Sequence, residues 1–218
     1  MGIRYIFLGP PGAGKGTAAV RLAGFLEVPH ISTGDMFREE MKEGTDLGKL
    51  AEECIGKGNL VPDRVTIEIV RRRLGRTDAR RGFILDGFPR TVPQAEALGG
   101  ILADEGEELD GVVYFAAGRE ILVRRLAARR ICRDCGTIYN LETMPPKRAG
   151  ICDRCGGELY RRRDDMPRAV EERLREYEEK TADLAEYYRR LGLLIEIDAE
   201  VDKDETFDEL KEMMSATR

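Results

Sequence analysis

A glycine-rich stretch near the start of the chain, GPPGAGKGT at residues 9–17, has the residue types and spacing of a phosphate-binding loop. Gly9 is followed by four residues and then by Gly14 and Lys15, as in a P-loop. In such loops backbone N–H groups surround phosphate oxygens, and the helix that follows adds a partial positive charge. Lys15 supplies a mobile cation to the outer phosphates. The stretch therefore predicts binding of a nucleoside triphosphate.

The residue after the lysine departs from the general P-loop pattern. That pattern places Ser or Thr directly after the lysine, whereas this chain has Gly16 there and Thr17 one position later. Direct coordination of Mg²⁺ by a loop hydroxyl is therefore in question, and we expect phosphates and waters to hold most of the metal.

Four of the five cysteines form two CxxC pairs, CRDC at 132–135 and CDRC at 152–155. Two such pairs, sixteen residues apart, are typical of a structural zinc site, because each pair turns two sulfurs toward one point. Since all four positions are cysteine, no ligand position is left for water, and a catalytic zinc is not expected. Free thiols or two disulfides are the alternatives. A chain without an export signal, expected in the cytoplasm, favours metal.

The elements that must position these residues follow from five short apolar runs, at residues 3–9, 28–31, 83–85, 112–115 and 193–197. Helical patterns separate the runs, and this alternation predicts a mostly parallel α/β sheet. Helix starts are expected near Pro62, Pro93 and Pro167. The apolar stripe from Val170 to Tyr188 predicts one core-facing helix. Residues 32–61 and 129–163 fit the alternation poorly and are interpreted as inserts.

The segment 129–163 is also a basic island, with nine Lys or Arg against four Asp or Glu in a chain whose formal net charge is −5. A zinc ribbon that reads single-stranded nucleic acid would be basic too, but it needs aromatic platforms for stacking. Between Cys132 and Cys155 the only aromatic residue is Tyr139. Nucleic-acid binding is therefore disfavoured.

Further motifs make a resemblance specific: STGDMFR (32–38), GNLVPD (58–63), DGFPRT (86–91) and RRRDD (161–165) follow GPPGAGKGT in order. Together they resemble the adenylate kinase family over almost the whole chain. The resemblance implies a single P-loop nucleoside monophosphate kinase domain over 1–218, with a five-stranded parallel sheet flanked by helices. It also implies an AMP-binding insert at 32–61 and a zinc-ribbon-like lid at 129–163. The implied reaction is reversible, Mg²⁺-dependent phosphoryl transfer from ATP to AMP, giving two ADP, for adenine nucleotide homeostasis.

The resemblance carries over site residues position by position. Positions that match the ATP site are Gly12, Ala13, Gly14, Lys15, Gly16, Thr17, Arg129, Ile138 and Tyr139. Positions that match the AMP site are Thr33, Arg38, Asn59, Leu60, Val61, Gly87, Arg90, Gln94, Arg162 and Arg173. Positions that match catalytic residues are Lys15, Arg90, Arg125, Arg162 and Arg173. Asp35 and Asp86 match contacts to Mg²⁺ through water, and Cys132, Cys135, Cys152 and Cys155 match the zinc ligands.

The chemistry of these side chains agrees with the implied reaction. In-line phosphoryl transfer needs positioning and charge neutralisation, which fixed guanidinium groups provide. A nucleoside monophosphate is already ionised near neutral pH, so no general base is needed in a chain with a single histidine. An amide such as Gln94 carries both the acceptor and the donor that adenine's amine and ring nitrogen require. His30 and Cys54 are expected to be structural. Ala199 stands where the family usually has glycine, which puts in question how closely that loop approaches the adenine of ATP.

Two other functions remain open from the residues alone. One is a kinase for another monophosphate, such as GMP, UMP or CMP. The other is a zinc-ribbon, ATP-dependent nucleic-acid binder. The favoured partners are ATP, AMP and ADP, without nucleic acid or membrane, and a monomer is expected.

Overall fold

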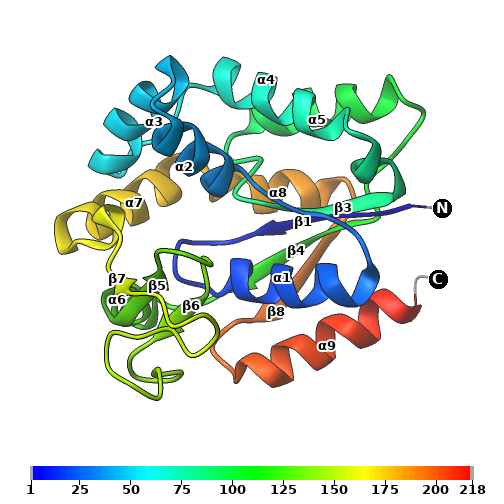
Figure 1. Ribbon diagram of the computed structural model, residues 1–218. Helices are drawn as coiled ribbons and strands as arrows, with labels where there is room; N and C mark the ends of the chain where they lie inside the picture. The colour runs from blue at the N-terminus through cyan, green and yellow to red at the C-terminus, as the bar shows by residue number, and fades with distance from the viewer. Residues whose placement is uncertain (1, 217–218) are drawn as a thin grey trace.

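A five-stranded parallel sheet forms the centre of the computed structural model, which describes residues 2–216 (Figure 1). Its strands are β1 (Ile3–Leu8), β2 (His30–Ser32), β3 (Gly82–Asp86), β4 (Gly111–Ala116) and β8 (Leu194–Asp198). They lie in the order β2-β3-β1-β4-β8, and every pairing is parallel. Parallel strands covered on both faces read as continuous apolar runs, which is why the sequence predicted them. The predicted fold class is confirmed.

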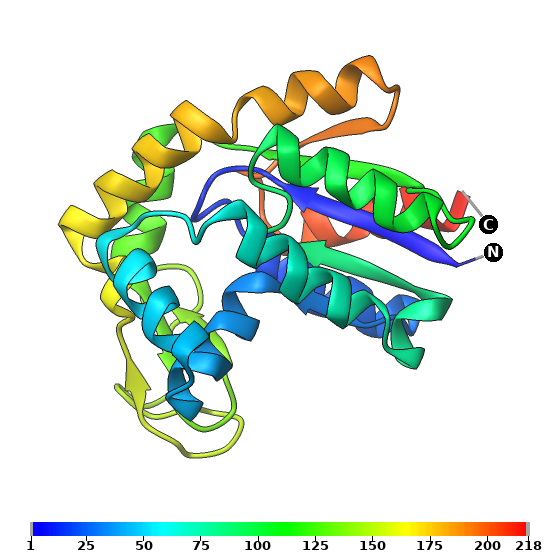
Figure 2. The same ribbon diagram turned by 90° about the horizontal axis from the view of Figure 1, so that it is seen from above.

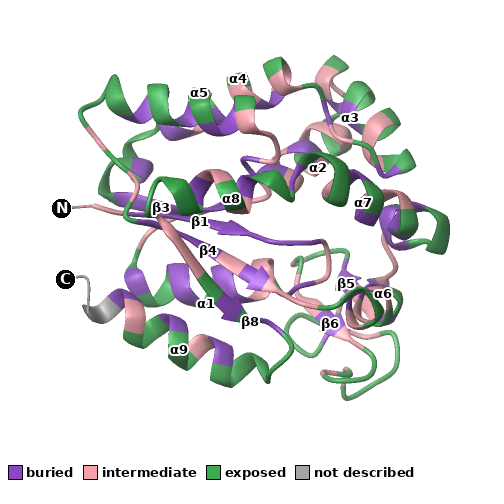
Figure 3. Ribbon diagram, turned by 180° about the vertical axis from the view of Figure 1, so that it is seen from behind, coloured by how far each residue is buried: buried purple, intermediate pink, exposed green. Residues whose placement is uncertain are grey.

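Helices cover both faces of the sheet, so the core has two layers. On one face pack α1 (Lys15–Leu26), α6 (Arg119–Ala128), the N-terminal part of α7 (Pro167–Lys180) and α9 (Lys203–Ala216). On the other pack α4 (Asp63–Leu74), α5 (Val92–Ala103) and α8 (Asp183–Arg190). Figure 3 shows the inner strands β1, β3 and β4 largely buried between these layers, while the edge strand β8 is partly exposed and the outer sides of the helices are exposed. The 3₁₀ turn η1 (Thr77–Arg81) leads into β3.

The stripe predicted as one helix is two helices, α7 and α8, and that prediction was wrong. The N–H groups of Thr181 and Ala182 both donate to the Tyr177 carbonyl, which ends α7. The Thr181 hydroxyl donates to the carbonyl of Arg90, 2.9 Å away, so the break is held by a residue distant in the sequence. The stripe keeps its buried character on both sides of the break.

Residues 33–57 form two packed helices, α2 (Thr33–Glu43) and α3 (Asp46–Lys57). The Ser32 and Thr45 side chains cap their N-termini by accepting from the N–H groups of Asp35 and Gly48. A Cβ at Gly48 would lie 2.1 Å from the Glu40 carbonyl oxygen, so only glycine permits this close approach. The pair has its own small apolar cluster with Phe37, Ala51 and Val61 at its centre.

Residues 129–163, called the cysteine segment below, contain a separate antiparallel sheet. Its strands are β5 (Arg129–Cys132), β6 (Ile138–Asn140) and β7 (Leu159–Tyr160), in the order β6-β5-β7, and the 3₁₀ turn η2 (Arg163–Asp165) follows. In Figure 2 this segment and the α2–α3 pair lie at the same end of the molecule, toward which β1 points. No helix within residues 2–216 combines the length and the apolar character needed to cross a membrane.

Candidate active site at the carboxyl ends of the strands

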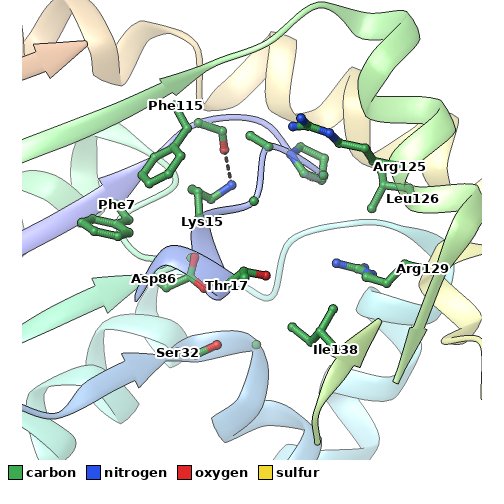
Figure 4. Close-up of a pocket in the computed structure, with 18 of the residues that line it drawn as sticks. Phe7, Lys15, Thr17, Ser32, Asp86, Phe115, Arg125, Leu126, Arg129 and Ile138 are labelled. Atoms are coloured by element: carbon green, nitrogen blue, oxygen red, sulfur yellow. Dashed lines mark hydrogen bonds between the residues drawn. The ribbon is translucent and has the colours of Figure 1, made fainter. Parts of the chain in front are cut away.

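One continuous cavity of about 610 Å³ lies between the central sheet, the α2–α3 pair and the cysteine segment. Ligand sites of open α/β sheets lie outside the carboxyl ends of the strands, and this cavity does so. Every residue that the sequence predicted for the ATP, AMP and magnesium sites lines it. Figure 4 shows Lys15, Thr17 and Asp86 on one side of the cavity, with Arg125, Arg129 and Ile138 across from them.

The P-loop connects β1 to α1 through backbone conformations that favour glycine. Gly9, Gly12 and Gly14 have φ values of +139°, +90° and +94°. A Cβ at Gly9 would also lie 2.6 Å from the Phe115 carbonyl oxygen. The turn leaves the N-terminal N–H groups of α1 at the cavity wall, where the partial charge of the helix favours an anion.

The Lys15 ammonium is held inside this loop. Its Nζ donates to the carbonyl oxygens of Gly9 and Pro10, at 2.6 and 2.8 Å. Burial lowers the pKa of Lys15 to about 8; Asp86 opposes the shift, whereas nearby guanidinium groups such as that of Arg90 add to it. The side chain is therefore mostly charged at neutral pH, and an approaching phosphate would stabilise that charge.

The glycine after the lysine has a spatial role. A Cβ at Gly16 would lie 3.2 Å from the Asp86 Oδ2 atom, so glycine lets this carboxylate approach the loop. Burial alone would raise the pKa of Asp86, but the adjacent His30 imidazole and the Lys15 ammonium bring it below its ordinary value. The departure from the general P-loop pattern therefore places an ionised carboxylate beside the phosphate loop.

His30, expected to be structural, lies 3.6 Å from Asp86, measured between Nε2 and Oδ2. The two residues sit on neighbouring parallel strands, where Ser32 pairs with Asp86. The sequence shows no carboxylate next to His30, because the two residues meet only through the strand order.

Asp165 gathers two of the predicted arginines. Its side chain is fully buried, and Arg129 donates to both of its carboxylate oxygens, with Nε 2.7 Å from Oδ2. Arg173 Nη1 lies 3.1 Å from Asp165 Oδ1 and also 3.1 Å from Asp164 Oδ2. Burial alone would lower the pKa of Arg129, but the two bonds to Asp165 raise it above the ordinary value. The RRRDD motif contains the Asp pair, but its sequence alone does not indicate this role.

A second group of arginines lies toward α2. Arg38 pairs with Asp35, and Arg162 Nη2 is 3.9 Å from the same carboxylate. Burial and the neighbouring Arg38 charge lower the pKa of Arg162 to about 10. Burial and the Arg173 charge lower the pKa of Arg90 to about 10 as well. Both guanidinium groups stay charged at neutral pH. The positive charges in this part of the cavity repel one another, so the cavity favours binding of a polyanion.

The backbone carbonyl groups of Gly87 and Ala199 accept hydrogen bonds from other predicted side chains. The Gly87 carbonyl accepts from Thr33 Oγ1 at 2.8 Å and from Arg90 Nε at 2.9 Å. Arg125 stands apart from the other arginines, because it donates to the Ala199 carbonyl at 2.6 Å and so holds the loop after β8. Ala199 is buried, and its N–H donates to the Ala116 carbonyl.

The four cysteines meet at one point, as their spacing predicted. The Sγ atoms of Cys132 and Cys155 are 3.4 Å apart and those of Cys135 and Cys152 are 3.6 Å apart, while all four lie within 4.8 Å of one another. Tetrahedral zinc with Zn–S bonds of about 2.3 Å separates its sulfurs by about 3.8 Å. The donor set and its geometry therefore fit structural zinc.

Two similar turns build this metal site. Gly136 and Gly156 follow the second cysteine of each pair with φ of +70° and +78°, and each donates its N–H to the carbonyl of the first cysteine. Tyr139, predicted in the ATP site, is buried with its hydroxyl 3.5 Å from the Cys152 sulfur. Its side chain thus supports the metal site, and the residue also lines the cavity.

Comparisons with known proteins agree with this geometry. The family model described as adenylate kinase matches residues 7–193. An adenylate kinase of Methanocella arvoryzae is 51% identical over 96% of this chain and 97% of its own length. Those of Thermosipho africanus and Caldanaerobacter subterraneus subsp. tengcongensis are 51% and 46% identical, covering 94% and 99% of this chain and 96% and 98% of their own lengths. The chain therefore belongs to the adenylate kinase family of phosphotransferases.

Proposed function

We propose that the chain catalyses the reversible, Mg²⁺-dependent transfer of the terminal phosphoryl group of ATP to AMP, giving two ADP and so balancing the adenine nucleotides. One observation carries this assignment. A single cavity extends from the phosphate loop to α2 and the start of α5, and largely buried arginines, among them Arg129, Arg162 and Arg173, line it. An enzyme that only hydrolysed ATP would not need the part of the cavity at α2 and α5.

The ATP side of this proposal runs from the P-loop to the cysteine segment. Backbone N–H groups of residues 12–17 bind the β- and γ-phosphates, and Lys15 neutralises them. Arg125 and Arg129 approach the phosphates from the opposite wall, where Figure 4 shows both side chains. Ile138 and the backbone of Tyr139 lie beside the adenosine of ATP.

The AMP side is formed by α2, residues 59–61 and the start of α5. Arg38 and Arg90 bind the monophosphate, while Thr33 and the Gly87 backbone lie beside the nucleoside. Asn59, Leu60 and Val61 line the wall behind it, and Gln94 reads the adenine edge. Arg162 and Arg173 reach both substrates, so they bind the transferring group.

The reaction needs no protein base in this arrangement. An ionised phosphate oxygen of AMP attacks the terminal phosphorus of ATP, the bond to the bridging oxygen breaks, and ADP leaves from each side. Fixed guanidinium groups neutralise charge on the transferring group, and they are already charged and oriented before the substrates meet. Mg²⁺ supplied with ATP neutralises its phosphates, and Asp35 and Asp86 would contact it through water.

The cysteine segment is proposed as a lid, residues 129–163, and residues 32–61 as the AMP-binding insert of the same kinase domain. A lid excludes water that would otherwise accept the phosphoryl group. The apolar cluster of the cysteine segment is small, with Tyr139 and Leu159 beside the cysteines, so bound zinc supplies stability that packing cannot. We further propose a cytoplasmic monomer that does not bind nucleic acid or membranes.

A coupled assay of ADP formation tests this function. Purified chain with ATP and Mg²⁺ is offered AMP, GMP, UMP or CMP at equal concentrations, and the metal content of the same sample is measured. AMP should be the preferred acceptor, with about one zinc per chain. Preference for another monophosphate would show that AMP is not the principal acceptor. Salt-sensitive binding of single-stranded nucleic acid, with no ADP formed from ATP and AMP, would replace the reaction itself.

A further inference from the structure

A partly buried set of hydrogen bonds surrounds Gln94 at the start of α5. The side chain is 1% exposed, yet it lines the wall of the cavity. Its Oε1 atom accepts from the Arg90 N–H at 2.7 Å, and its Nε2 atom donates to Asp63 Oδ1 at 2.6 Å. The other carboxylate oxygen of Asp63 accepts from the Thr91 hydroxyl at 2.7 Å. Asp63 is the last residue of the GNLVPD motif, and no role for it was predicted from the sequence.

These partners permit only one orientation of the Gln94 amide. The Arg90 N–H can only donate and the Asp63 carboxylate can only accept, so Oε1 must face the first and Nε2 the second. A rotation by 180° would place two donors against each other and a carbonyl oxygen against a carboxylate. Buried groups mismatched in this way lose their hydrogen bonds and keep the full cost of desolvation.

The orientation decides what the amide offers to a ligand. Oε1 has a second lone pair and Nε2 a second hydrogen, so the amide accepts at one fixed point and donates at another. A 6-aminopurine matches this order, because its exocyclic amine donates and its adjacent ring nitrogen accepts. A 6-oxopurine has the reverse order, with an accepting oxygen and a donating N1–H.

We propose that Asp63 is a positioning residue that sets the acceptor base preference of the enzyme, by holding the Gln94 amide in the orientation that accepts 6-aminopurine and rejects 6-oxopurine. This inference rests on the proposed function, in which Gln94 reads the adenine of AMP. Asp63 acts through Gln94 and does not itself contact the base.

The position of Asp63 in the fold suits this role. It is the first residue of α4, directly after Pro62, whereas Thr91 caps α5 by accepting from the Gln94 N–H. Helices α4 and α5 contact each other directly and share the apolar core on one face of the sheet. The Asp63 bonds therefore join the starts of two helices that are each anchored in the core, so the amide is held by rigid elements.

The test compares AMP with IMP, which differs at the six-position and N1 of the base, in the wild type and in Asp63→Asn. The substitution keeps the shape of the side chain but lets its own amide rotate and donate to a rotated Gln94. Hydrogen-bonding sites reject a mismatched analogue by about 10⁴- to 10⁵-fold in kcat/KM. Because the Arg90 N–H still favours the original orientation, we expect the AMP-to-IMP ratio of kcat/KM to fall by about 10- to 100-fold, with KM for ATP within about twofold of wild type.

Asp183→Asn is the matched control. Asp183 is also the first residue of a helix, α8, but it is exposed and lies outside the cavity lining. The Asp183→Asn variant loses the same charge at a helix start, and it should leave kcat/KM for AMP and for IMP unchanged. If Asp63→Asn does not fold, Thr91→Val removes one of the two hydrogen bonds of Asp63 and should shift the ratio in the same direction by a smaller factor.

The possible failures are distinguishable. Wild-type protein that makes no ADP from ATP and AMP, or a Gln94→Leu variant that keeps the full preference for AMP over IMP, would overturn the proposed function of the site. If Gln94→Leu loses that preference while Asp63→Asn keeps it, the positioning role of Asp63 is wrong and the proposed function stands. A ratio that falls equally in Asp183→Asn would also overturn the positioning role.

Discussion

Replacing Asp165 with asparagine should destabilise the protein far more than an exposed substitution of the same kind. The Asp165 side chain is fully buried and binds Arg129 and Arg173, whose side chains are only 18% and 16% exposed. Asparagine has nearly the same shape but no charge, so Arg129 loses its principal partner and Arg173 loses one of its two carboxylate partners. Removing one member of a buried ion pair costs about 3–5 kcal/mol, because the remaining charge is left uncompensated. For a chain of this length that loss corresponds to a Tm lowered by about 6–20 °C.

Asp78→Asn provides the matched control for this prediction. Asp78 accepts two hydrogen bonds from Arg73, at 3.0 and 2.7 Å, so the pair has the same bidentate form. Its side chain is 52% exposed, however, and exposed pairs contribute about 0–1 kcal/mol. Both variants are compared with wild type by calorimetry and urea unfolding at neutral pH.

Inorganic phosphate separates the loss of charge compensation from a loss of packing. If unpaired guanidinium groups cause the instability, phosphate should raise the Tm of Asp165→Asn more than that of wild type, because the anion takes the place of the carboxylate. A loss of unfolding free energy below about 1 kcal/mol, equal to that of Asp78→Asn, would refute the reasoning from buried charge.

Four further predictions concern the lysine and the metal. Removing zinc with a chelator should lower the Tm and the hydrogen-exchange protection of residues 129–163 before it abolishes ADP formation, and unchanged protection would contradict a structural metal. Lys15→Met should lower kcat by about 10²- to 10³-fold in the ADP assay. Because burial lowers the pKa of Lys15 from 10.5 to about 8, the same variant should gain at most about 3 kcal/mol of stability at pH 7. That gain in stability should shrink between pH 8 and 10.5, where the folded wild type no longer carries the charge. Denaturant unfolding of the variant and the wild type at pH 7 and at pH 10.5 measures the change in this gain. Finally, kcat/KM for ATP in the wild type should fall as pH rises through about 8, because phosphate binding needs the charged ammonium; a flat profile to pH 9 would contradict this.

The central sheet and the phosphate loop could be predicted because their signals are local. Strands buried on both faces read as apolar runs, and the loop requires glycine at positions where its backbone has positive φ. The cysteine cluster was also predictable, since each CxxC turn brings two sulfurs together within four residues.

The remaining features depend on contacts between residues far apart in the chain. The break between α7 and α8 follows from the hydrogen bond of Thr181 to the Arg90 carbonyl, and the apolar stripe alone gave no sign of it. The role of Asp165 depends on Arg129, 36 residues earlier, and that of Asp63 on Gln94, 31 residues later. Motif resemblance identified the arginines and the amide, but it did not identify the carboxylates that orient them.

The contact between Arg129 and Asp165 also has a consequence for how the cysteine segment forms. It joins the first residue of β5 to the last residue of η2, so it closes the stem of a long loop whose tip is closed by the four cysteines. Closing a flexible loop of this length costs about 3 kcal/mol of chain entropy. Once the stem is closed, the cysteines search a smaller volume, and less entropy is lost when they gather around a metal. The affinity for zinc therefore depends on a carboxylate that never touches the ion.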